Sequence, residues 1–589
     1  MRFRASAFAA CIIAALVLPA IAREPAPEPQ PAPEPLGPPT IVERVVEGNA
    51  NIAADAILAA VTSQVGTPYD RNAAAADARA IKALGWFVAV DFRIEPAPGG
   101  ARLVFIVEEY DKLMGVEFDG NTVITKEELQ SVLVSKVGEV INERHLDSDM
   151  QNILQLYQDR QYPVVDFRQL PTRRQVEGGS VIVYHILEGV IEEIRIQSNT
   201  KTKDWVIRRE LFIQVGQVLY LKLLQRDAQR LFAKDWFENI DTRILPGSEP
   251  GKVIVVFIIT ERKTGFLAFG VSWTSLQGFV GTIDLSDTNF RGSGVRLLAR
   301  GEFGGQDSFE FGYGTDWFAG KPVHFDASVY DRLIARQAFD PTTGSFLFRE
   351  KRQGTTVTFN RPIHRDPFGP ETRVFLSLRN DAVSAQPIAG GTLPDVSFLK
   401  DFTIRSIGLG LQRDTRLPYP QSPTKGAYLI LQGEAAGFGG APFNKVRLDW
   451  RRYIRVGKDK GAFETRTIAY RLLLGTITGD PPGLENFFLG GPDTLRGYDV
   501  FRFPGRNMAH LNFEYRHPVG NRVSLVLFTD IGDAWGGPFA DSFGDPDFTL
   551  HVGYGLGLRF AVPGLGPIRI DQGFSKEKSQ LYFSIGHAF

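Results

Sequence analysis

The C-terminal half of the chain is a long series of short alternating segments, and this pattern restricts the fold most. From Gly265 to Phe589, apolar and polar residues alternate in stretches separated by Gly, Asp, Asn and Pro. In Val552 to Phe560 every second residue is large and apolar, and the residues between are three glycines and an arginine. Strands of a transmembrane barrel alternate in this way because one face meets lipid and the other the lumen. About 325 residues, in strand-and-turn units of about 20, predict roughly 16 antiparallel strands.

The N-terminus predicts export from the cytoplasm. Met-Arg-Phe-Arg precedes a mostly apolar run that ends near Leu18, and Ala-Ile-Ala follows, so we predict a signal peptide at residues 1–22. The one cysteine, Cys11, lies in this run and would be lost on cleavage, which leaves the mature chain without a disulfide of its own. No later stretch approaches the roughly 18 apolar residues of a membrane helix. A chain that spans a membrane without such helices does so as a closed barrel.

A threefold repeat follows a proline-rich linker. Residues 23–40 lack a hydrophobic period, which predicts an extended tether. Asn49, Asn121 and Asn199 each follow a short apolar strand, and a Val-Gly pair ends 17 residues after each of them. Helical stretches and closing strands complete each unit, which predicts a β-α-α-β-β order with a helix pair on a three-stranded sheet. We place the units at residues 41–110, 111–189 and 190–262, and the barrel at 263–589.

One loop in the barrel carries a single cation between turn-forming residues. The stretch from Leu489 to Tyr498 reads Leu-Gly-Gly-Pro-Asp-Thr-Leu-Arg-Gly-Tyr, with the cation at Arg496. Counting by twos along the strands that follow points Glu514, Phe528 and Asp530 into the lumen. Since a buried charge must find a partner, we expect Arg496 to meet both carboxylates and the ring face, an arrangement worth about 1–3 kcal/mol where it is shielded from water. From the spacing alone, an exposed glycine turn is the competing interpretation.

These motifs resemble those of the BamA and TamA superfamily of outer-membrane insertases. Residues 490–498 are similar to its arginine-glycine-aromatic loop, and residues 528–532, Phe-Thr-Asp-Ile-Gly, to the strand motif that holds that loop. The likeness continues through residues 566–571 to the terminal Phe589, and the repeats resemble POTRA (polypeptide-transport-associated) domains. The resemblance implies α+β POTRA repeats followed by a 16-stranded antiparallel transmembrane β-barrel. The lumen-loop anchor that it implies consists of Arg496, Gly497, Tyr498, Glu514, Phe528, Asp530 and Gly532.

The resemblance also implies a lateral seam between the first barrel strand, about Gly265 to Trp273, and the last, about Gln580 to Phe589. Glycines in the first strand weaken a ladder. A seam with few hydrogen bonds would pair with the edge of a client strand and release it sideways into lipid. The seam residues are Gly265, Phe269, Gly270, Phe583, Ile585 and Phe589.

The function implied by the resemblance is non-enzymatic assembly of outer-membrane proteins in a bacterium, with the N-terminal domains in the periplasm. The POTRA units would receive unfolded barrel clients by β-augmentation, and the seam would assist their insertion. The implied partners are these clients, outer-membrane lipid and a periplasmic accessory or TamB-like protein. Balanced charge, 66 basic against 67 acidic residues, gives no reason to expect nucleic acid. Enzyme motifs are lacking and the eight histidines are scattered, so we predict no cofactor and no metal.

Other functions remain open at this stage. A two-partner secretion transporter would export a client through the barrel, but that family typically carries two POTRA units and a plugging helix. A passive porin or surface antigen leaves the repeats without a purpose, and each repeat could also be a rigid spacer. Three units match the TamA branch in number, whereas the BamA branch usually has five. The branch, the clients and the accessory partners stay undecided.

Overall fold

The computed structural model describes residues 37–589 except 275–277, 305–306, 341–343, 364–366, 369–370, 388–399, 418–421, 459, 461–462, 563–565 and 586–589. The predicted signal peptide, Cys11, most of the linker and Phe589 lie outside these residues. The chain divides into two compact units within the second repeat: residues 120–125, 154–168 and 185–589 form one unit, and the preceding and intervening segments form the other. Within the described ranges, no helix has the length and apolar character needed to cross a membrane.

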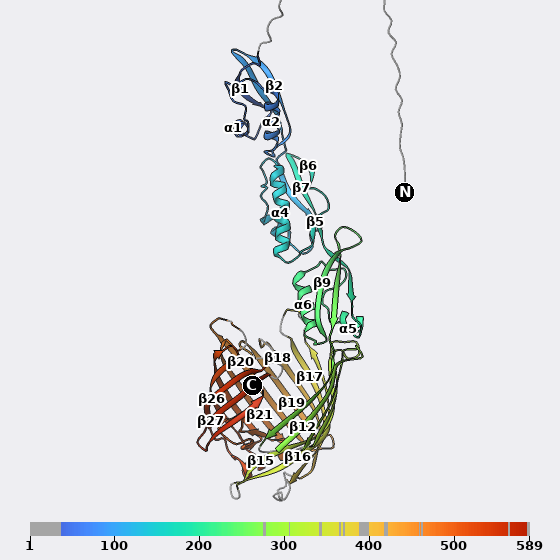
Figure 1. The fold of residues 1–589 in the computed structure, drawn as a ribbon, viewed down its shortest axis with the longest axis vertical. Coiled ribbons are helices and arrows are strands. Elements are labelled where there is room, and N and C mark those ends of the chain that lie inside the picture. The colour runs from blue at the N-terminus through green and yellow to red at the C-terminus, as the bar shows by residue number, and fades with distance from the viewer. Residues whose placement is uncertain are drawn as a thin grey trace, which may run out of the picture. The chain divides into compact units, whose positions relative to one another are not determined.

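The first and third repeats have the predicted β-α-α-β-β order (Figure 1). In each, the first and last strands are parallel and the sheet order places the last strand in the middle. Buried Ala74, Ala78 and Ile81 recur along one helix of the first repeat with helical spacing, and that apolar face packs on the sheet. The elements are β1 (Ile41–Glu47), α1 (Ala54–Leu58), α2 (Arg71–Lys82), β2 (Phe87–Ala97) and β3 (Gly100–Glu109), then β8 (Val190–Gln197), α5 (Asp204–Arg208), α6 (Leu221–Phe232), β9 (Phe237–Pro246) and β10 (Lys252–Glu261).

The second repeat has the same plan with one strand broken in two. Its β7 pairs with β4 and, at different points along its length, with β5 and β6, so the sheet has four strands instead of three. The break falls at residues 168–171, which include Pro171, a residue that cannot donate to a ladder. The elements are β4 (Leu113–Asp119), α3 (Lys126–Ser131), α4 (Glu143–Asp159), β5 (Val165–Phe167), β6 (Thr172–Val176) and β7 (Gly179–Glu188).

The repeated asparagines and glycines are turn residues. The amide of Asn49 donates to the carbonyl oxygen of Ile52 at 2.9 Å, and Asn121 and Asn199 make the same bond three residues ahead. Gly66, Gly138 and Gly216 have φ angles of 93°, 95° and 90°. Residues other than glycine rarely adopt this conformation, so the spacing seen in the sequence follows from backbone geometry.

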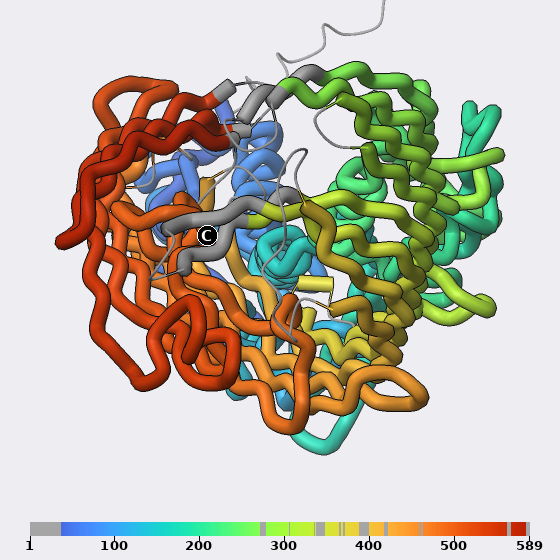
Figure 2. Tube along the Cα trace, turned by 90° about the horizontal axis from the view of Figure 1, so that it is seen from below, coloured from blue at the N-terminus to red at the C-terminus, as the bar shows by residue number. Residues whose placement is uncertain are grey.

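The C-terminal part is one antiparallel sheet of sixteen strands, as the sequence predicts. Figure 2 views the curved sheet end-on, from its green start round to its dark red end. Each strand pairs with the next, except that β21 pairs with β24 across an inserted segment. The strands are β11 (Gly265–Thr274), β12 (Gly278–Phe290), β13 (Val295–Gly304), β14 (Ser308–Thr315), β15 (His324–Asp340), β16 (Gly344–Pro362), β17 (Thr372–Pro387), β18 (Phe402–Asp414), β19 (Gly426–Ala436), β20 (Phe443–Val456), β21 (Arg466–Gly479), β24 (Asn507–Gly520), β25 (Val523–Trp535), β26 (His551–Val562), β27 (Gly566–Phe574) and β28 (Ser579–Ile585).

The outer face of the sheet is apolar and the inner face holds buried polar groups. On β25, Leu525 and Leu527 are exposed, whereas Val526 and Phe528 between and beside them are buried. On β26, large apolar side chains are exposed at every second position, but Arg559 is only 2% exposed. An apolar exterior of this extent fits a lipid environment and would be a liability in water.

The segment between β21 and β24, residues 480–506, packs against the inner face of the sheet. We call it the lumen loop; it holds a short 3-10 turn (Gly483–Glu485) and the small ladder of β22 (Phe487–Leu489) with β23 (Phe503–Gly505). Its Leu489, Tyr498 and Phe503 are buried in one apolar cluster with side chains of β16, β18 and β21. The helix α7 (Pro538–Phe543), from the loop between β25 and β26, adds Phe539 and Phe543 to the same cluster.

Candidate functional site

Arg496 lies at the centre of the lumen loop and is fully buried. Its guanidinium binds Asp530 in a bidentate manner, with Nε to Oδ2 at 2.7 Å and Nη2 to Oδ1 at 2.8 Å. Its Nη1 donates to Glu514 at 2.8 Å and to Asp571 at 3.4 Å. The guanidinium carbon lies 3.5 Å from the centre of the Phe528 ring. One cation is thus held by three carboxylates and an aromatic face, all on strands of the barrel.

Two more arginines complete this cluster. Arg516 Nε donates to Glu514 at 2.9 Å, and Arg559 Nη1 donates to Asp571 at 2.5 Å. Arg559 also reaches Glu514 at 3.3 Å. Three cations therefore balance three carboxylates on β24, β25, β26, β27 and the lumen loop. Because a buried charge that loses its partner is costly, these balanced pairs resist rearrangement. They therefore attach the lumen loop rigidly to the barrel wall. We call these six side chains the anchor cluster: Arg496, Arg516, Arg559, Glu514, Asp530 and Asp571.

The backbone next to Arg496 is tied to the last strand. The amide of Gly497 donates to the hydroxyl of Tyr582 on β28 at 3.0 Å, and that hydroxyl donates to the carbonyl of Tyr498 at 2.5 Å. Gly497 has a φ of 96°, and a Cβ added there would lie 2.7 Å from the carbonyl carbon of Phe574. Glycine is therefore required where the loop approaches β27.

The structure brings together most of the predicted anchor residues. Arg496, Glu514, Phe528 and Asp530 are in mutual contact, and the hydroxyl of Tyr498 donates to a backbone carbonyl of β26 at 3.3 Å. Gly532 lies further along β25, paired with His510, and a Cβ there would meet the carbonyl oxygen of Ala509 at 2.3 Å. Its contribution is to strand packing.

Sequence reasoning missed Asp571, Arg559 and Tyr582. The alternation that pointed Glu514 inward also places Arg559 and Asp571 on the inner face, so a count by twos along the last strands could have found both. Two glycines, one on β26 and one on β27, face the same loop. A Cβ at Gly553 would lie 1.8 Å from the carbonyl oxygen of Arg496, and one at Gly573 would lie 2.6 Å from the nitrogen of Gly497. These glycines make room for the lumen loop.

The predicted seam residues lie on the two edges of the sheet. In the described chain, strand order runs from β11 to β28 and no ladder joins these two edges. Phe269, opposite Ile283 of β12, is 72% exposed, and Phe583, opposite Ile570 of β27, is 68% exposed. Gly265 begins β11 and Gly270 lies within it, while Ile585 ends β28. Phe589 lies beyond the described residues.

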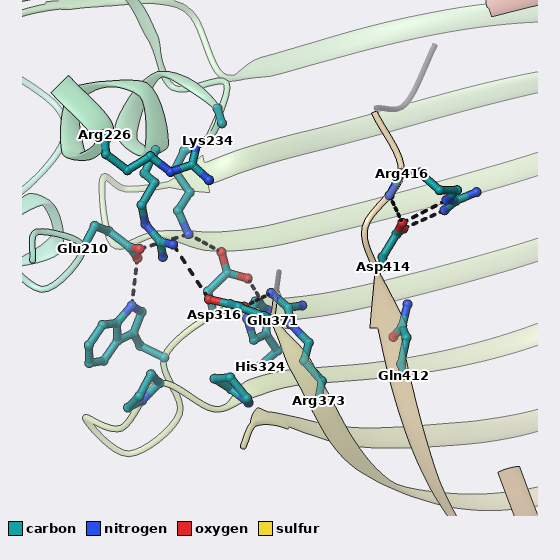
Figure 3. Close-up of a pocket in the computed structure, with 15 residues that line it drawn as sticks. Glu210, Arg226, Lys234, Asp316, His324, Glu371, Arg373, Gln412, Asp414 and Arg416 are labelled. Atoms are coloured by element: carbon teal, nitrogen blue, oxygen red, sulfur yellow. Dashed lines mark hydrogen bonds and ion pairs between the residues drawn. The ribbon is translucent and has the colours of Figure 1, made fainter. Parts of the chain in front are cut away.

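A charged cavity of about 550 Å³ lies between α6 and the turns of the barrel on the same side as the third repeat (Figure 3). Lys234 Nζ lies 3.1 Å from Glu210 and 2.7 Å from Asp316, and the indole of Trp317 donates to Glu210 at 2.8 Å. Burial favours a higher pKa for Asp316, but the hydrogen bond with His324 and the charge of Lys234 outweigh it and hold that pKa well below its usual range. The cavity wall is therefore an ion-pair junction between the third repeat and the barrel.

The same junction reaches the first strands of the barrel. Lys201 of the third repeat lies 3.1 Å from Asp287 on β12 and donates to the hydroxyl of Thr264, the residue before β11. The indole of Trp236 donates to the carbonyl of Thr288 at 3.0 Å. At Gly292, in the turn after β12, a Cβ would lie 1.7 Å from the carbonyl oxygen of Lys201. The third repeat and the start of the barrel are thus in direct contact.

The fold and its buried loop define a class, a membrane β-barrel preceded by POTRA-type repeats. A model of the Omp85 superfamily domain matches residues 289–589, and a model of the POTRA family, described as surface antigen variable number repeat, matches residues 112–189 and 190–262. The chain belongs to the Omp85 superfamily. Proteins of this superfamily are non-enzymatic, in agreement with the prediction that the chain is not an enzyme.

Curated relatives and solved structures support this placement. The chain is 24% identical over 539 residues to outer envelope protein 80 of Arabidopsis thaliana chloroplasts, covering 85% of this chain and 69% of the relative. It is 24% identical over 517 residues to the outer membrane protein assembly factor BamA of Nitratidesulfovibrio vulgaris, covering 81% of this chain and 62% of the relative. The chain thus spans about two thirds of these relatives.

Two solved structures share the fold. The crystal structure of Haemophilus ducreyi BamA lacking POTRA domains 1–3 matches with a TM-score of 0.55 at 18% identity, covering 80% of this chain and 98% of that one. CdiB from Escherichia coli matches with a TM-score of 0.55 at 16% identity, covering 81% of this chain and 90% of that one. Equal scores for two different proteins mean that the fold alone does not choose between their functions.

Proposed function

We propose that this chain assembles outer-membrane proteins: its repeats receive unfolded barrel clients in the bacterial periplasm, and its barrel assists their insertion into the outer membrane. The observation that carries this proposal is that the two edge strands of the barrel sheet are not paired with each other. Ladders join all fifteen pairs of neighbouring strands from β11 to β28, whereas no ladder joins β28 back to β11 in the described residues. An unpaired strand edge offers the backbone hydrogen bonds that a folding client strand needs.

The anchor cluster supports insertion at this seam, because it holds the neighbouring strands in place. It ties the lumen loop to β24 through β27, and Tyr582 extends the attachment to β28. Because the lumen loop is fixed to these strands, it stabilises the C-terminal side of the barrel wall. Opening at the edge of β28 would then leave the remainder of the wall in place.

The repeats offer further strand edges for clients. In the first and third repeats, β2 and β9 lie at the outer edge of their sheets, each paired on one side only. Recognition through backbone hydrogen bonds depends little on side chains and tolerates many clients. Because the third repeat contacts Asp287 and Thr264, a strand bound to it lies near the start of the barrel sheet. A periplasmic accessory or TamB-like protein would dock on the same repeats.

Site-specific photo-crosslinking in cells tests the proposal. A photoreactive residue at Phe269 or Phe583 should capture newly exported barrel proteins at the seam. The control position is Leu409 of β18, which is 63% exposed on the outer face but far from either edge in strand order. Capture at the two edge positions and not at the control supports insertion at the seam. Equal capture at all three positions, or no capture at the two edge positions, would reject the proposal.

A further inference from the structure

Three side chains with metal-binding chemistry meet at the end of the barrel away from the third repeat. Asp533 lies near the end of β25, Asp545 in the loop after α7, and His551 is the first residue of β26. One ligand atom from each lies within 4.8 Å of the other two. The eight histidines are scattered along the sequence, which is why the pattern predicted no metal, but antiparallel pairing of β25 with β26 brings these groups together.

One carboxylate oxygen in this cluster is buried without a hydrogen bond. Asp533 is fully buried, and its Oδ2 accepts from the amide of Thr549 at 2.8 Å. Its Oδ1 has no hydrogen-bond partner in the part of the chain that the structure describes, and it faces His551 Nε2 at 3.7 Å. Leaving a buried carboxylate oxygen without a donor is costly, so the site as it stands is incomplete.

The separations are suited to a shared cation. A gap of 3.7 Å between Asp533 Oδ1 and His551 Nε2 is too long for a hydrogen bond. Two ligand atoms that each lie about 2.0–2.2 Å from one metal ion can be this far apart. Asp545 Oδ2 lies 2.5 Å from His551 Nε2, and its side chain is 26% exposed, so it can shift to take its place around an ion. Water would fill the remaining positions.

We propose that Asp533, Asp545 and His551 form a binding site for a divalent transition-metal ion, with Zn²⁺ as the first candidate and Mn²⁺ as the second. An imidazole nitrogen beside two carboxylates suits these ions, whereas Ca²⁺ and Mg²⁺ prefer oxygen ligands alone. The cation would neutralise the buried charge of Asp533. It would also supply the partner that Oδ1 lacks.

The bound ion would stabilise the end of the barrel that lies away from the third repeat. It would join β25, β26 and the loop that carries α7, whose Phe539 and Phe543 pack on the lumen loop. The ring of His551 also stacks on Phe503 of the lumen loop, with centres 3.8 Å apart and planes at 18°. Metal binding would therefore stabilise the lumen loop from the end opposite the junction with the third repeat.

The test uses the full-length protein, purified in detergent without a polyhistidine tag and stripped with EDTA. Titration with Zn²⁺ in a calorimeter should reveal one saturable site, and Co²⁺ should give visible absorption bands of a bound ion. Bound Zn²⁺ should raise the unfolding temperature, because it binds the folded state alone. Asp533→Asn, Asp545→Asn and His551→Gln should each weaken binding by at least about tenfold, as loss of a ligand costs no less than loss of a supporting group. Asp547→Asn, in the same loop, should bind as the unchanged chain does.

Asp545→Asn decides the outcome if the two buried substitutions fail to fold, because Asp545 is partly exposed. Its folding is checked by heat-modifiable migration on gels. Absence of saturable binding to the unchanged protein would overturn the proposal. Saturable binding that survives Asp545→Asn and His551→Gln undiminished would overturn it as well.

Discussion

The two sides of the barrel sheet are built in different ways. On β24 through β27, the charged side chains of the anchor cluster point inward and pair with one another or with Arg496, and Arg496, Glu514 and Asp530 are each at 0% exposure. On β11, Phe266 and Leu267 are 54% and 55% exposed. Successive strand residues point to opposite faces, so both faces of β11 lack cover at these two positions. The first side is held by dense internal contacts, whereas the described side chains of β11, at residues 265–270, are exposed.

The ion pairs of the two sides also differ in their exposure to solvent. Arg300 on β13 pairs with Asp284 on β12 at 2.6 Å, but these side chains are 44% and 24% exposed. Exposed pairs contribute less than about 1 kcal/mol, whereas breaking a buried pair costs several times more. A barrel with one rigid side and one loosely held edge can open at that edge without losing its fold, which is the property an insertase needs.

The largest effect is expected from Arg496→Ala. Among the described side chains, it leaves Asp530 with the amide of Asn512 as its donor, whereas Glu514 keeps Arg516 and Arg559. Removing one member of a buried pair typically costs about 3–5 kcal/mol. We expect a large fall in the unfolding temperature and in the amount of assembled outer-membrane proteins. The matched control, Arg300→Ala on the other side, should change both little. Equal effects of the two substitutions would contradict the difference between the sides.

A smaller effect is expected from Gly553→Ala. The added methyl group would overlap the carbonyl oxygen of Arg496, which a Cβ would approach to 1.8 Å. Overpacking of this kind typically costs about 1–3 kcal/mol. Gly433→Ala on β19 is the control, since no atom lies within 4 Å of a Cβ there. Comparing heat-modifiable migration of the two variants measures the effect, and a stable Gly553→Ala protein would mean that the loop does not need this approach.

The smallest effect is expected on the stability of the third repeat as the pH falls. Glu261 accepts hydrogen bonds from the backbone of Thr200, Lys201 and Thr202. Burial favours a higher pKa, but these bonds outweigh it and lower the pKa of Glu261 from 4.5 to about 2. Its contribution to stability is therefore complete above pH 4.5 and is lost as the pH falls toward 2.

Hydrogen exchange at residues 200–202 checks this expectation. Glu261→Gln should exchange faster than the unchanged chain at neutral pH, and the difference should shrink as the pH falls below 4.5. Glu249→Gln in the same repeat is the control. A difference that grows in acid would show that the sign is wrong.

Much of this architecture was accessible from the sequence because it rests on periodic patterns. Period-two alternation predicted the barrel strands and the inward direction of Glu514 and Asp530. The length of the barrel region predicted the strand number, and the Asn-to-Gly spacing predicted the repeats. The full anchor cluster was not accessible, because Asp571 and Tyr582 meet the loop only when distant strands come side by side. Sequence reasoning also missed the buried carboxylates Asp77, Asp149 and Asp227, although each lies 28 residues after a repeated asparagine. Their role, accepting hydrogen bonds from loop amides in each repeat, is visible only in the structure.

A disulfide across the seam tests the central claim most directly. Cysteines at Phe269 and Phe583, which both lie on the outer face, with neighbouring pairs to allow for register, would lock β11 to β28. Once the predicted signal peptide with Cys11 is removed, no competing thiol remains. The control replaces Leu285 and Ala299, which already face each other on β12 and β13, so locking them should change nothing. The readout is the amount of folded outer-membrane proteins in cells with and without reductant, beside gels that confirm crosslinking. We predict that the seam disulfide abolishes assembly until it is reduced; full activity with the seam completely crosslinked would contradict insertion at this edge.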